Sequence, residues 1–460
     1  MNRTANTTYL ALSMLLVAGS ASTLSARTGR SNLLYVMNND PATGQNAVLG
    51  YSRNADGSLT DLPGSPFYTY GTGLRNPNEI IGPDDSDSEM VLTADKRFLY
   101  VVNEGSDNIS AFSVRLDGSL VPVAGSPFPS GGKRPSSLAL ANGFLYVVNK
   151  GDGLLPTAAA PTYIPATARS TNYAVHQIVA NGALQQVTNA TVNAPGGSSP
   201  SQIVATRDGQ FLFGNNFLSP SFDVPDIGVF PLARSLMLSF TADEDDGSME
   251  SQPAVGLPKV SPFSPAGTFR PFILGLQPHP TQNILYADAV LASALTVWTW
   301  DDNGKLSYVR AVSAGTALGQ CWTAFDPAAK WLYVATVVQN VIGVFSLADP
   351  LNPVFLQNFA LGGPQTPLPP NTPEAFGSTT APANLAVDPT GKFLYVVNHH
   401  TCAEALLKTG FDQTNCPLGN AIHVLQIGSD GKLTEPAGSP FIFPPSVVPT
   451  NTHPKGLIIL

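Results

Sequence analysis

A six-residue run of aliphatic and aromatic residues recurs along the chain, and a polar residue closes it in most copies. The run FLYVVN begins at Phe98, Phe144 and Phe393. Weaker copies begin at Leu33, Phe211, Ile284 and Trp331. Short apolar runs between turn residues are typical of well-buried strands. The pattern therefore predicts seven related units, each built around one buried strand.

The same pieces flank these runs in the same order. A proline and a short apolar run come before the buried strand, as at Pro135 and Leu138, and an alternating strand such as 109–114 follows it. A fourth strand ends in Gly-Ser-Pro-Phe at Gly64, Gly125 and Gly438. Between the third and fourth strands a tight turn carries Asp-Gly or Asn-Gly, a dipeptide that reaches positive φ at low cost and suits hairpins. These turns begin at Asp56, Asp117, Asn181, Asn303 and Asp430.

Four antiparallel strands in each of seven units predict an all-β fold, a seven-bladed β-propeller. The chain enters at Leu33 in the second strand of a unit and leaves through 454–460, which has the pattern of a first strand. We therefore expect the N- and C-terminal strands to share one blade and close the ring. The fourth blade, around 227–261, has the least regular pattern.

Composition excludes several other classes of protein. The 460 residues include 41 glycines and 41 prolines, too many for a long helical bundle. The 43% hydrophobic content excludes a disordered chain. The net charge is −9, and no basic run exceeds a pair such as Lys133-Arg134, so we expect no nucleic-acid partner.

The N-terminus has the pattern of an export signal. Arg3 precedes the apolar run 10–18, and small residues follow it. This order predicts a secretory signal peptide over 1–26, a single propeller domain over 27–460, and a secreted or periplasmic protein. Every later apolar run is shorter than the roughly 18 residues that a membrane-spanning helix needs, so no membrane span is expected.

Three cysteines are present. Cys402 and Cys416 lie in one loop, and an exported chain meets oxidising conditions, so we predict a disulfide between them. Cys321 lies in an apolar segment and is expected to be a buried structural thiol.

This repeat resembles that of the YVTN-repeat, lactonase-type seven-bladed propellers. The family includes 6-phosphogluconolactonase-like enzymes and fungal carboxymuconate cyclases, and the resemblance covers nearly the whole mature chain. Members often carry Pro-Arg-His at the start of a first strand, and no copy here keeps the Arg-His pair; Ser136-Ser137 and Ala383-Asn384 stand in two of those places. Glu104 matches the Asn-Glu that often ends a second strand in relatives. The resemblance implies hydrolysis or formation of a lactone of a small carboxylated ring.

Strand order assigns the connections to two faces of the ring. With strands A to D numbered outward from the axis, the A–B and C–D connections are short turns on one face. The B–C and D–A connections share the other face, where long loops are expected at 150–171, 216–226, 362–381, 399–420 and 440–452. Long loops on a rigid scaffold commonly carry binding sites. We therefore expect a functional site on this loop-rich face, and the alternative is loop variation without a function on a stable scaffold.

Polar residues at the ends of B strands and just before A strands should border the axial channel. Lys150, Asp288 and Gln320 are expected at this rim. Arginine binds carboxylates bidentately, and histidine or glutamate can activate water near neutral pH. The alternative is an ordinary polar rim whose groups are satisfied by water. Our catalytic candidates are Glu104, Arg134, Arg270, His399, His400 and His453.

Two acidic stretches and a histidine pair were weighed as metal sites. The stretches 84–89 and 243–246 lack the EF-hand pattern, and solvated loops are the better interpretation of both. His399 and His400, with Asp412 in the same loop and His453 as a further candidate, suggest zinc or copper, but adjacent histidines on a strand point to opposite faces. His279, between two prolines, is expected on the face of the short turns. We predict no metal and no cofactor.

Two functional hypotheses remain. The first is an exported lactonase or cyclase that acts on a small molecule in the axial channel. The second is a non-catalytic secreted propeller that binds a protein or a glycan through the loop-rich face, with 402–416 as part of that surface. A monomer is expected under both.

Overall fold

The computed structural model describes most of the chain after residue 29. The described residues are 30–74, 86–151, 171–194, 198–218, 226–227, 230–231, 235–258, 272–290, 292–317, 319–337, 339–362, 380–400, 420–449 and 452–460. The predicted signal peptide, Cys402 and Cys416 therefore lie outside the described residues. No described helix is both long and apolar enough to cross a bilayer.

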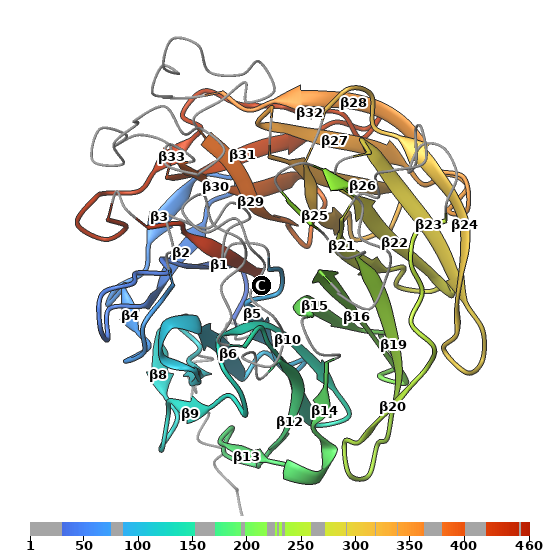
Figure 1. Ribbon diagram of the computed structural model, residues 1–460. Coiled ribbons are helices and arrows are strands. Elements are labelled where there is room, and N and C mark those ends of the chain that lie inside the picture. Colours follow the sequence, from blue (N-terminus) through green and yellow to red (C-terminus); the bar gives the residue numbers. More distant parts are fainter. Residues whose placement is uncertain are drawn as a thin grey trace, which may run out of the picture.

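Seven antiparallel sheets surround a central axis, and the C-terminus lies near the middle of the ring (Figure 1). This confirms the predicted seven-bladed propeller. Two single-turn segments, η1 (Glu104–Ser106) and η3 (Thr188–Ala190), are the helical elements of the described chain.

Blades 1 to 3 each hold four strands and a short fifth piece. Blade 1 contains β34 (Lys455–Ile459), β1 (Leu33–Met37), β2 (Ala47–Arg53) and β3 (Leu59–Asp61), with β4 (Phe67–Tyr68). Blade 2 contains β5 (Met90–Leu92), β6 (Phe98–Asn103), β7 (Asn108–Val114) and β8 (Leu120–Pro122), with β9 (Phe128–Pro129). Blade 3 contains β10 (Pro135–Ala141), β11 (Phe144–Asn149), β12 (Asn172–Ile178) and β13 (Leu184–Gln186), with β14 (Val192–Asn193).

The remaining blades keep the same order from the axis outward. Blade 4 contains β15 (Ser199–Ala205), β16 (Phe211–Leu218), β19 (Leu236–Ala242) and β20 (Met249–Ser251), and the hairpin of β17 (Asp226–Ile227) and β18 (Phe230–Pro231) lies in its B–C connection. Blade 5 contains β21 (Ile273–Pro278), β22 (Ile284–Ala289), β23 (Ala294–Trp300) and β24 (Leu306–Ser313). Blade 6 contains β25 (Gln320–Phe325), β26 (Trp331–Thr336), β27 (Val341–Ser346) and β28 (Val354–Ala360). Blade 7 contains β29 (Thr380–Val387), β30 (Phe393–His400), β31 (Ala421–Ile427) and β32 (Leu433–Thr434), with β33 (Phe441–Ile442).

The two ends of the described chain meet in blade 1. The last strand β34 pairs antiparallel with the first strand β1, as the sequence predicted. Arg53 fastens this closure, because its Nη1 lies 3.3 Å from Asp388 Oδ2 of blade 7 and its Nη2 donates to Leu460 O at 3.0 Å. The side chains of Arg53 and Asp388 are almost fully buried, so the ion pair acts in a medium of low dielectric.

The recurring tyrosine of the FLYVVN runs joins neighbouring blades. In four copies its hydroxyl donates to the backbone carbonyl of the glycine in the C–D turn of the next blade. The pairs are Tyr35 with Gly118 at 2.7 Å, Tyr100 with Gly182 at 3.0 Å, Tyr333 with Gly431 at 3.1 Å, and Tyr395 with Gly57 at 2.9 Å. Residues that the sequence assigned to strand burial and to turn geometry thus also hold the ring together.

The Gly-Ser-Pro-Phe motif lies inside the fourth strand rather than at its end. In blades 1, 2 and 7 the outer strand is split in two, and the serine hydroxyl fills the gap by accepting a hydrogen bond from strand C. The bonds run from Gly50 N to Ser65 Oγ at 3.0 Å, from Ala111 N to Ser126 Oγ at 2.9 Å, and from Val424 N to Ser439 Oγ at 2.9 Å. The Ser–Pro bond is cis in each copy.

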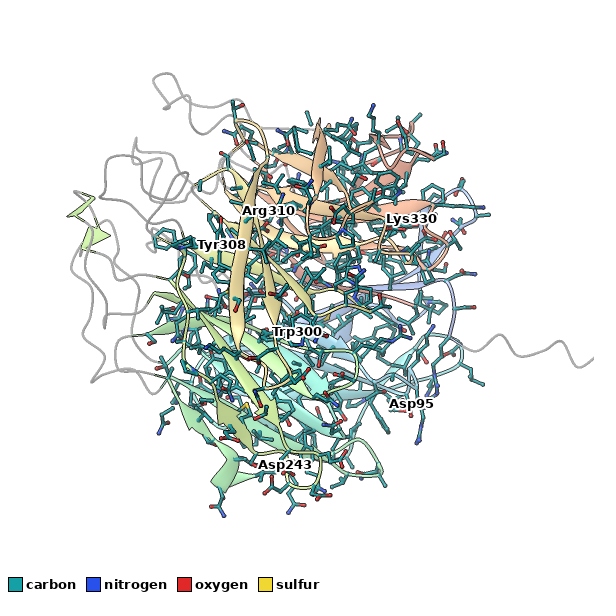
Figure 2. The ribbon with its side chains drawn as sticks, turned by 90° about the vertical axis from the view of Figure 1, so that its right-hand side faces the viewer. Asp95, Asp243, Trp300, Tyr308, Arg310 and Lys330 are labelled. Atoms are coloured by element: carbon teal, nitrogen blue, oxygen red, sulfur yellow. The ribbon has the colours of Figure 1, made fainter. Side chains whose placement is uncertain are left out.

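The A–B turns lie together on one side of the ring. Figure 2 shows Asp95 and Lys330, from the A–B turns of blades 2 and 6, on the same side. The long segments 152–170, 363–379 and 401–419 fall in B–C or D–A connections, as expected, and lie outside the described residues. Cys321 is a buried thiol whose Sγ donates to Gly319 O at 3.2 Å, in agreement with its predicted structural role.

Candidate functional site at the propeller axis

A cavity of about 690 Å³ lies on the axis and is lined by residues of all seven inner strands or their flanks. At one end its wall includes Asp87, Glu89 and Asn384, and at the other end Arg207 and Pro280. The last two residues belong to A–B turns. We call the end at Asp87, Glu89 and Asn384 the inner end of the cavity. From there the cavity extends toward the face of the short turns, which is opposite the loop-rich face on which we expected the site. Its volume suits a small molecule.

Two carboxyl groups from blade 2 form the inner end of this cavity. Asp87 and Glu89 directly precede β5, and Asn384 of β29 donates its Nδ2 to Asp87 Oδ1 and to Glu89 Oε2, at 3.3 Å each. Gln202 of β15 donates Nε2 to Asp87 Oδ2 at 2.9 Å. Side chains from blades 2, 4 and 7 thus converge on one carboxyl pair.

The two amides are themselves held in place. Gly456 N donates to Asn384 Oδ1 at 2.7 Å, and Leu276 N donates to Gln202 Oε1 at 2.7 Å. These bonds fix which end of each amide faces the carboxyl groups, because the oxygen is already engaged with a backbone donor. The amide N–H groups therefore point at Asp87 and Glu89.

Burial governs the protonation of the pair. Desolvation raises the pKa of Asp87 well above its usual value, and the charge of Glu89 raises it further. Desolvation also raises the pKa of Glu89, whereas the Lys455 ammonium opposes this shift. Lys455 therefore favours the charged form of Glu89, whereas the negative charge of Glu89 disfavours the charged form of Asp87. A carboxyl pair with such unequal surroundings can divide the roles of acid and base.

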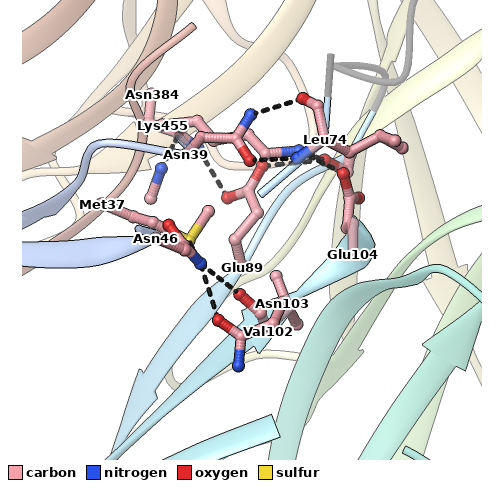
Figure 3. A network of polar contacts seen from close by, with 12 residues as sticks. Met37, Asn39, Asn46, Leu74, Glu89, Val102, Asn103, Glu104, Asn384 and Lys455 are labelled. Atoms are coloured by element: carbon pink, nitrogen blue, oxygen red, sulfur yellow. Dashed lines mark hydrogen bonds and ion pairs between the residues drawn. The ribbon is translucent and has the colours of Figure 1, made fainter. Parts of the chain in front are cut away.

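A buried ion pair lies beside the carboxyls (Figure 3). Lys455 Nζ of β34 is 3.0 Å from Glu104 Oε2 of η1 and donates to Ser86 Oγ at 3.2 Å, and both charged side chains are almost completely buried. Ser86 Oγ in turn donates to Glu89 Oε1 at 2.9 Å. Glu104, a predicted rim residue, is therefore engaged in an ion pair that connects through Ser86 to the carboxyl pair.

Asp288, at the end of β22, is a third buried carboxyl of this layer. It is 0% exposed, and within the described part of the chain neither of its oxygens has a hydrogen-bond partner. Desolvation raises its pKa well above the usual range, and the charge of Asp87 adds to the shift. Gly275 has a φ of +61°, and a Cβ there would lie 2.3 Å from Asp288 Oδ2, so the glycine makes room for this carboxyl.

The structure brings two of the predicted histidines together. The rings of His399 and His453 lie 4.3 Å apart between centroids, and both residues are buried. Arg134 has a φ of +55° and donates its backbone N–H to Asp107 Oδ1 at 2.8 Å. Arg270 and the side chain of His400 lie outside the described residues. His279 is at the turn face, as expected, and it also lines the cavity.

The sequence interpretation of 84–89 as a solvated loop was wrong. Glu89 is 0% exposed and Asp87 lies against the cavity, whereas the other acidic run, 243–246, is exposed as expected. The error came from treating the stretch only as an acidic run. A usable signal was present, since Asp87 and Glu89 directly precede an A strand, the position from which polar residues were expected to reach the channel. Asp84 and Asp85 lie outside the described residues.

No group of three or more His, Cys, Asp or Glu side chains within the described ranges is arranged to hold a metal ion. Asp412, from the weighed zinc or copper site, lies outside those ranges.

Solved structures with the same fold include several lactonase-type proteins. A putative 6-phosphogluconolactonase from Bacteroides uniformis superposes with a TM-score of 0.62 at 15% identity, over 94% of this chain and 100% of the other. One from Bacteroides fragilis gives 0.60 at 16% identity, over 94% and 98%. A periplasmic gluconolactonase from Pseudomonas aeruginosa gives 0.59 at 16% identity, over 93% and 98%.

Neither a protein-family model nor a curated protein sequence matches the chain. At such identities the structural likeness establishes the fold. The chain is a seven-bladed β-propeller that shares its fold with lactonase-type propellers, the architecture that its repeat resembles.

Proposed function

We propose that this protein hydrolyses, or in reverse forms, a lactone of a small ring in the axial cavity. The observation that carries the proposal is the carboxyl pair Asp87–Glu89, bridged by the Asn384 amide at the inner end of the cavity. The fold shared with proteins described as lactonases supports the choice of reaction.

The pair supplies both proton transfers of lactone hydrolysis. Ionised Glu89 removes a proton from water while the water oxygen attacks the lactone carbonyl carbon. The ring C–O bond then breaks, and protonated Asp87 gives its proton to the departing ring oxygen. Water and lactone are consumed, a hydroxy acid is formed, and the pair ends with one shared proton, as it began.

The neighbouring groups set these two roles. Lys455 opposes the rise in the pKa of Glu89 and so keeps this carboxyl available as the base. Burial and the charge of Glu89 both raise the pKa of Asp87, so this carboxyl keeps its proton and acts as the acid. Gln202 and Asn384 act as positioning residues, because they orient the carboxyl oxygens without reaching the reacting bond.

Proton release from a panel of γ- and δ-lactones tests this proposal. Glu89→Gln and Asp87→Asn should each lower kcat by about 100-fold or more, the usual size of a general acid–base contribution. Asp245→Asn, in the exposed acidic turn, is the matched control and should leave kcat unchanged.

Retention of full activity by both axial variants would contradict the assignment. A protein that turns over no lactone, yet loses a protein or glycan partner when residues 402–416 are deleted, would favour the non-catalytic alternative.

A further inference from the structure

The inner end of the axial cavity carries an excess of acidic groups. Asp87 and Glu89 line it, and Asp288 and Glu104 are buried behind them. Among the ion pairs of the described chain, the one in this cluster joins Lys455 Nζ to Glu104 Oε2 at 3.0 Å. Even if Asp87 and Asp288 both hold a proton, Glu89 and Glu104 carry two negative charges against the one positive charge of Lys455, counted over these described side chains.

The wall of the cavity does not offset this charge. Between its two ends the lining includes apolar side chains such as Leu140, Val204 and Leu457. Arg207 and His279 are the basic residues among those that line it, and both lie at the far end beside the A–B turns. Arg207 is exposed to water, which screens its charge. Burial lowers the pKa of His279, so this side chain is neutral at pH 7.

From this distribution of charge we infer that the site selects an uncharged lactone and discriminates against one whose ring carries a carboxylate or a phosphate. The inference rests on the proposed function and names its substrate class. It differs from the carboxylated ring that the sequence resemblance implied, because no basic side chain of the described lining stands at the inner end to receive the carboxylate.

The expected discrimination follows from Coulomb's law. A carboxylate placed several ångströms from one uncompensated negative charge, in a partly buried site, is repelled strongly enough to weaken binding by about tenfold or more. An uncharged ring of the same shape avoids this repulsion and can accept a hydrogen bond from the protonated member of the pair. The site thus excludes anions by repulsion rather than by size.

Binding of two lactams that resist hydrolysis tests this inference. Glucono-δ-lactam is uncharged, and glucaro-δ-lactam is its counterpart with a carboxylate. Calorimetry at pH 8 and low ionic strength should show that the wild-type protein binds the uncharged lactam about tenfold more tightly or better. In the double variant Asp87→Asn/Glu89→Gln the ratio should fall to about threefold or less, because the negative charge of Glu89 is removed and residue 87 can no longer ionise. Asp245→Asn should leave the ratio unchanged, and thermal unfolding checks that each variant is folded.

Equal or tighter binding of the carboxylated lactam by the wild-type protein would overturn the inference. So would an unchanged ratio in the folded double variant, or a wild-type protein that binds neither lactam. Hydrolysis of the matching lactones, measured in parallel, separates this inference from the proposed function. Turnover without preference for the uncharged ring refutes the substrate class alone, whereas selective lactam binding without turnover refutes the catalytic proposal alone.

Discussion

At the scale of single residues, the axial site is defined by carboxyl groups whose charge is disfavoured. Asp288 is fully buried and Asp87 is half-buried at the cavity wall. The charge of Glu89 raises the pKa of Asp87, and the charge of Asp87 raises the pKa of Asp288. Gln202 and Asn384 donate hydrogen bonds to Asp87, whereas no described residue donates one to Asp288. Hydrogen bonds therefore orient the Asp87 carboxyl for proton transfer, whereas Asp288 affects the site through its charge.

Asp288 makes the stability of the fold depend on pH. Its pKa is raised in the folded state, so it favours folding at low pH, and that contribution is lost as pH rises from the ordinary aspartate range through the raised value. Asp288→Asn removes this dependence. The wild type should therefore lose about 1 kcal/mol or more of unfolding free energy between pH 5 and pH 8 that the variant keeps.

Urea unfolding of both proteins at the two pH values measures this difference. Asp245→Asn, on the exposed turn, serves as control and should unfold with the pH dependence of the wild type. An Asp288→Asn variant that keeps the wild-type pH dependence would show that this carboxyl is not buried as described.

At the scale of elements, the glycine of a C–D turn commonly joins its blade to the B strand of the preceding blade. Gly182, in the C–D turn of blade 3, accepts a hydrogen bond from Tyr100 and lies against Phe98, both from β6 of blade 2. A Cβ on Gly182 would lie 2.3 Å from the Phe98 ring, and the residue has a φ of +84°. The glycine is thus required both by the turn and by the contact between blades.

Two glycine-to-alanine substitutions separate these requirements. Gly143, in the A–B turn of blade 3, has a φ of +81°, but a Cβ there meets nothing within 4 Å. Gly143→Ala therefore measures the cost of the turn alone, about 1 kcal/mol. Gly182→Ala should lose at least about 1 kcal/mol more, because the Phe98 ring must move.

Chemical denaturation of the two variants, with the wild type as reference, gives this comparison. Equal losses of stability at Gly143 and Gly182 would mean that the contact between blades contributes nothing beyond turn geometry.

The elements were predictable from the sequence, and the site was predictable only in part. FLYVVN and Asp-Gly repeat at regular intervals, and their local chemistry determines buried strands and tight turns, so strand order and ring closure followed. The site depends on side chains that are distant in sequence. Asp87 and Asn384 are 297 positions apart, and Asp87 and Gln202 are 115 apart. Glu104 was predicted as a site residue because it follows a B strand. Its partner Lys455 was not predicted, because the two residues meet only when the ring closes.

At the scale of the whole molecule, the strand that closes the ring also completes the site. Strand β34 carries Lys455 to Glu104 and places Gly456 against Asn384, while it pairs with β1. The cavity wall likewise needs the inner strands of all seven blades. A propeller with an open ring would therefore lack both the cation and the amide geometry on which the carboxyl pair depends.

A crystal structure of the protein with glucono-δ-lactam bound shows whether the axial cavity is the ligand site, because it locates the ligand without assuming turnover. We expect the lactam in the axial cavity, with its carbonyl or ring nitrogen within hydrogen-bond distance, about 3 Å, of the Asp87 or Glu89 carboxyl. A lactam bound on the loop-rich face, with the axial cavity filled only by water, would contradict the account.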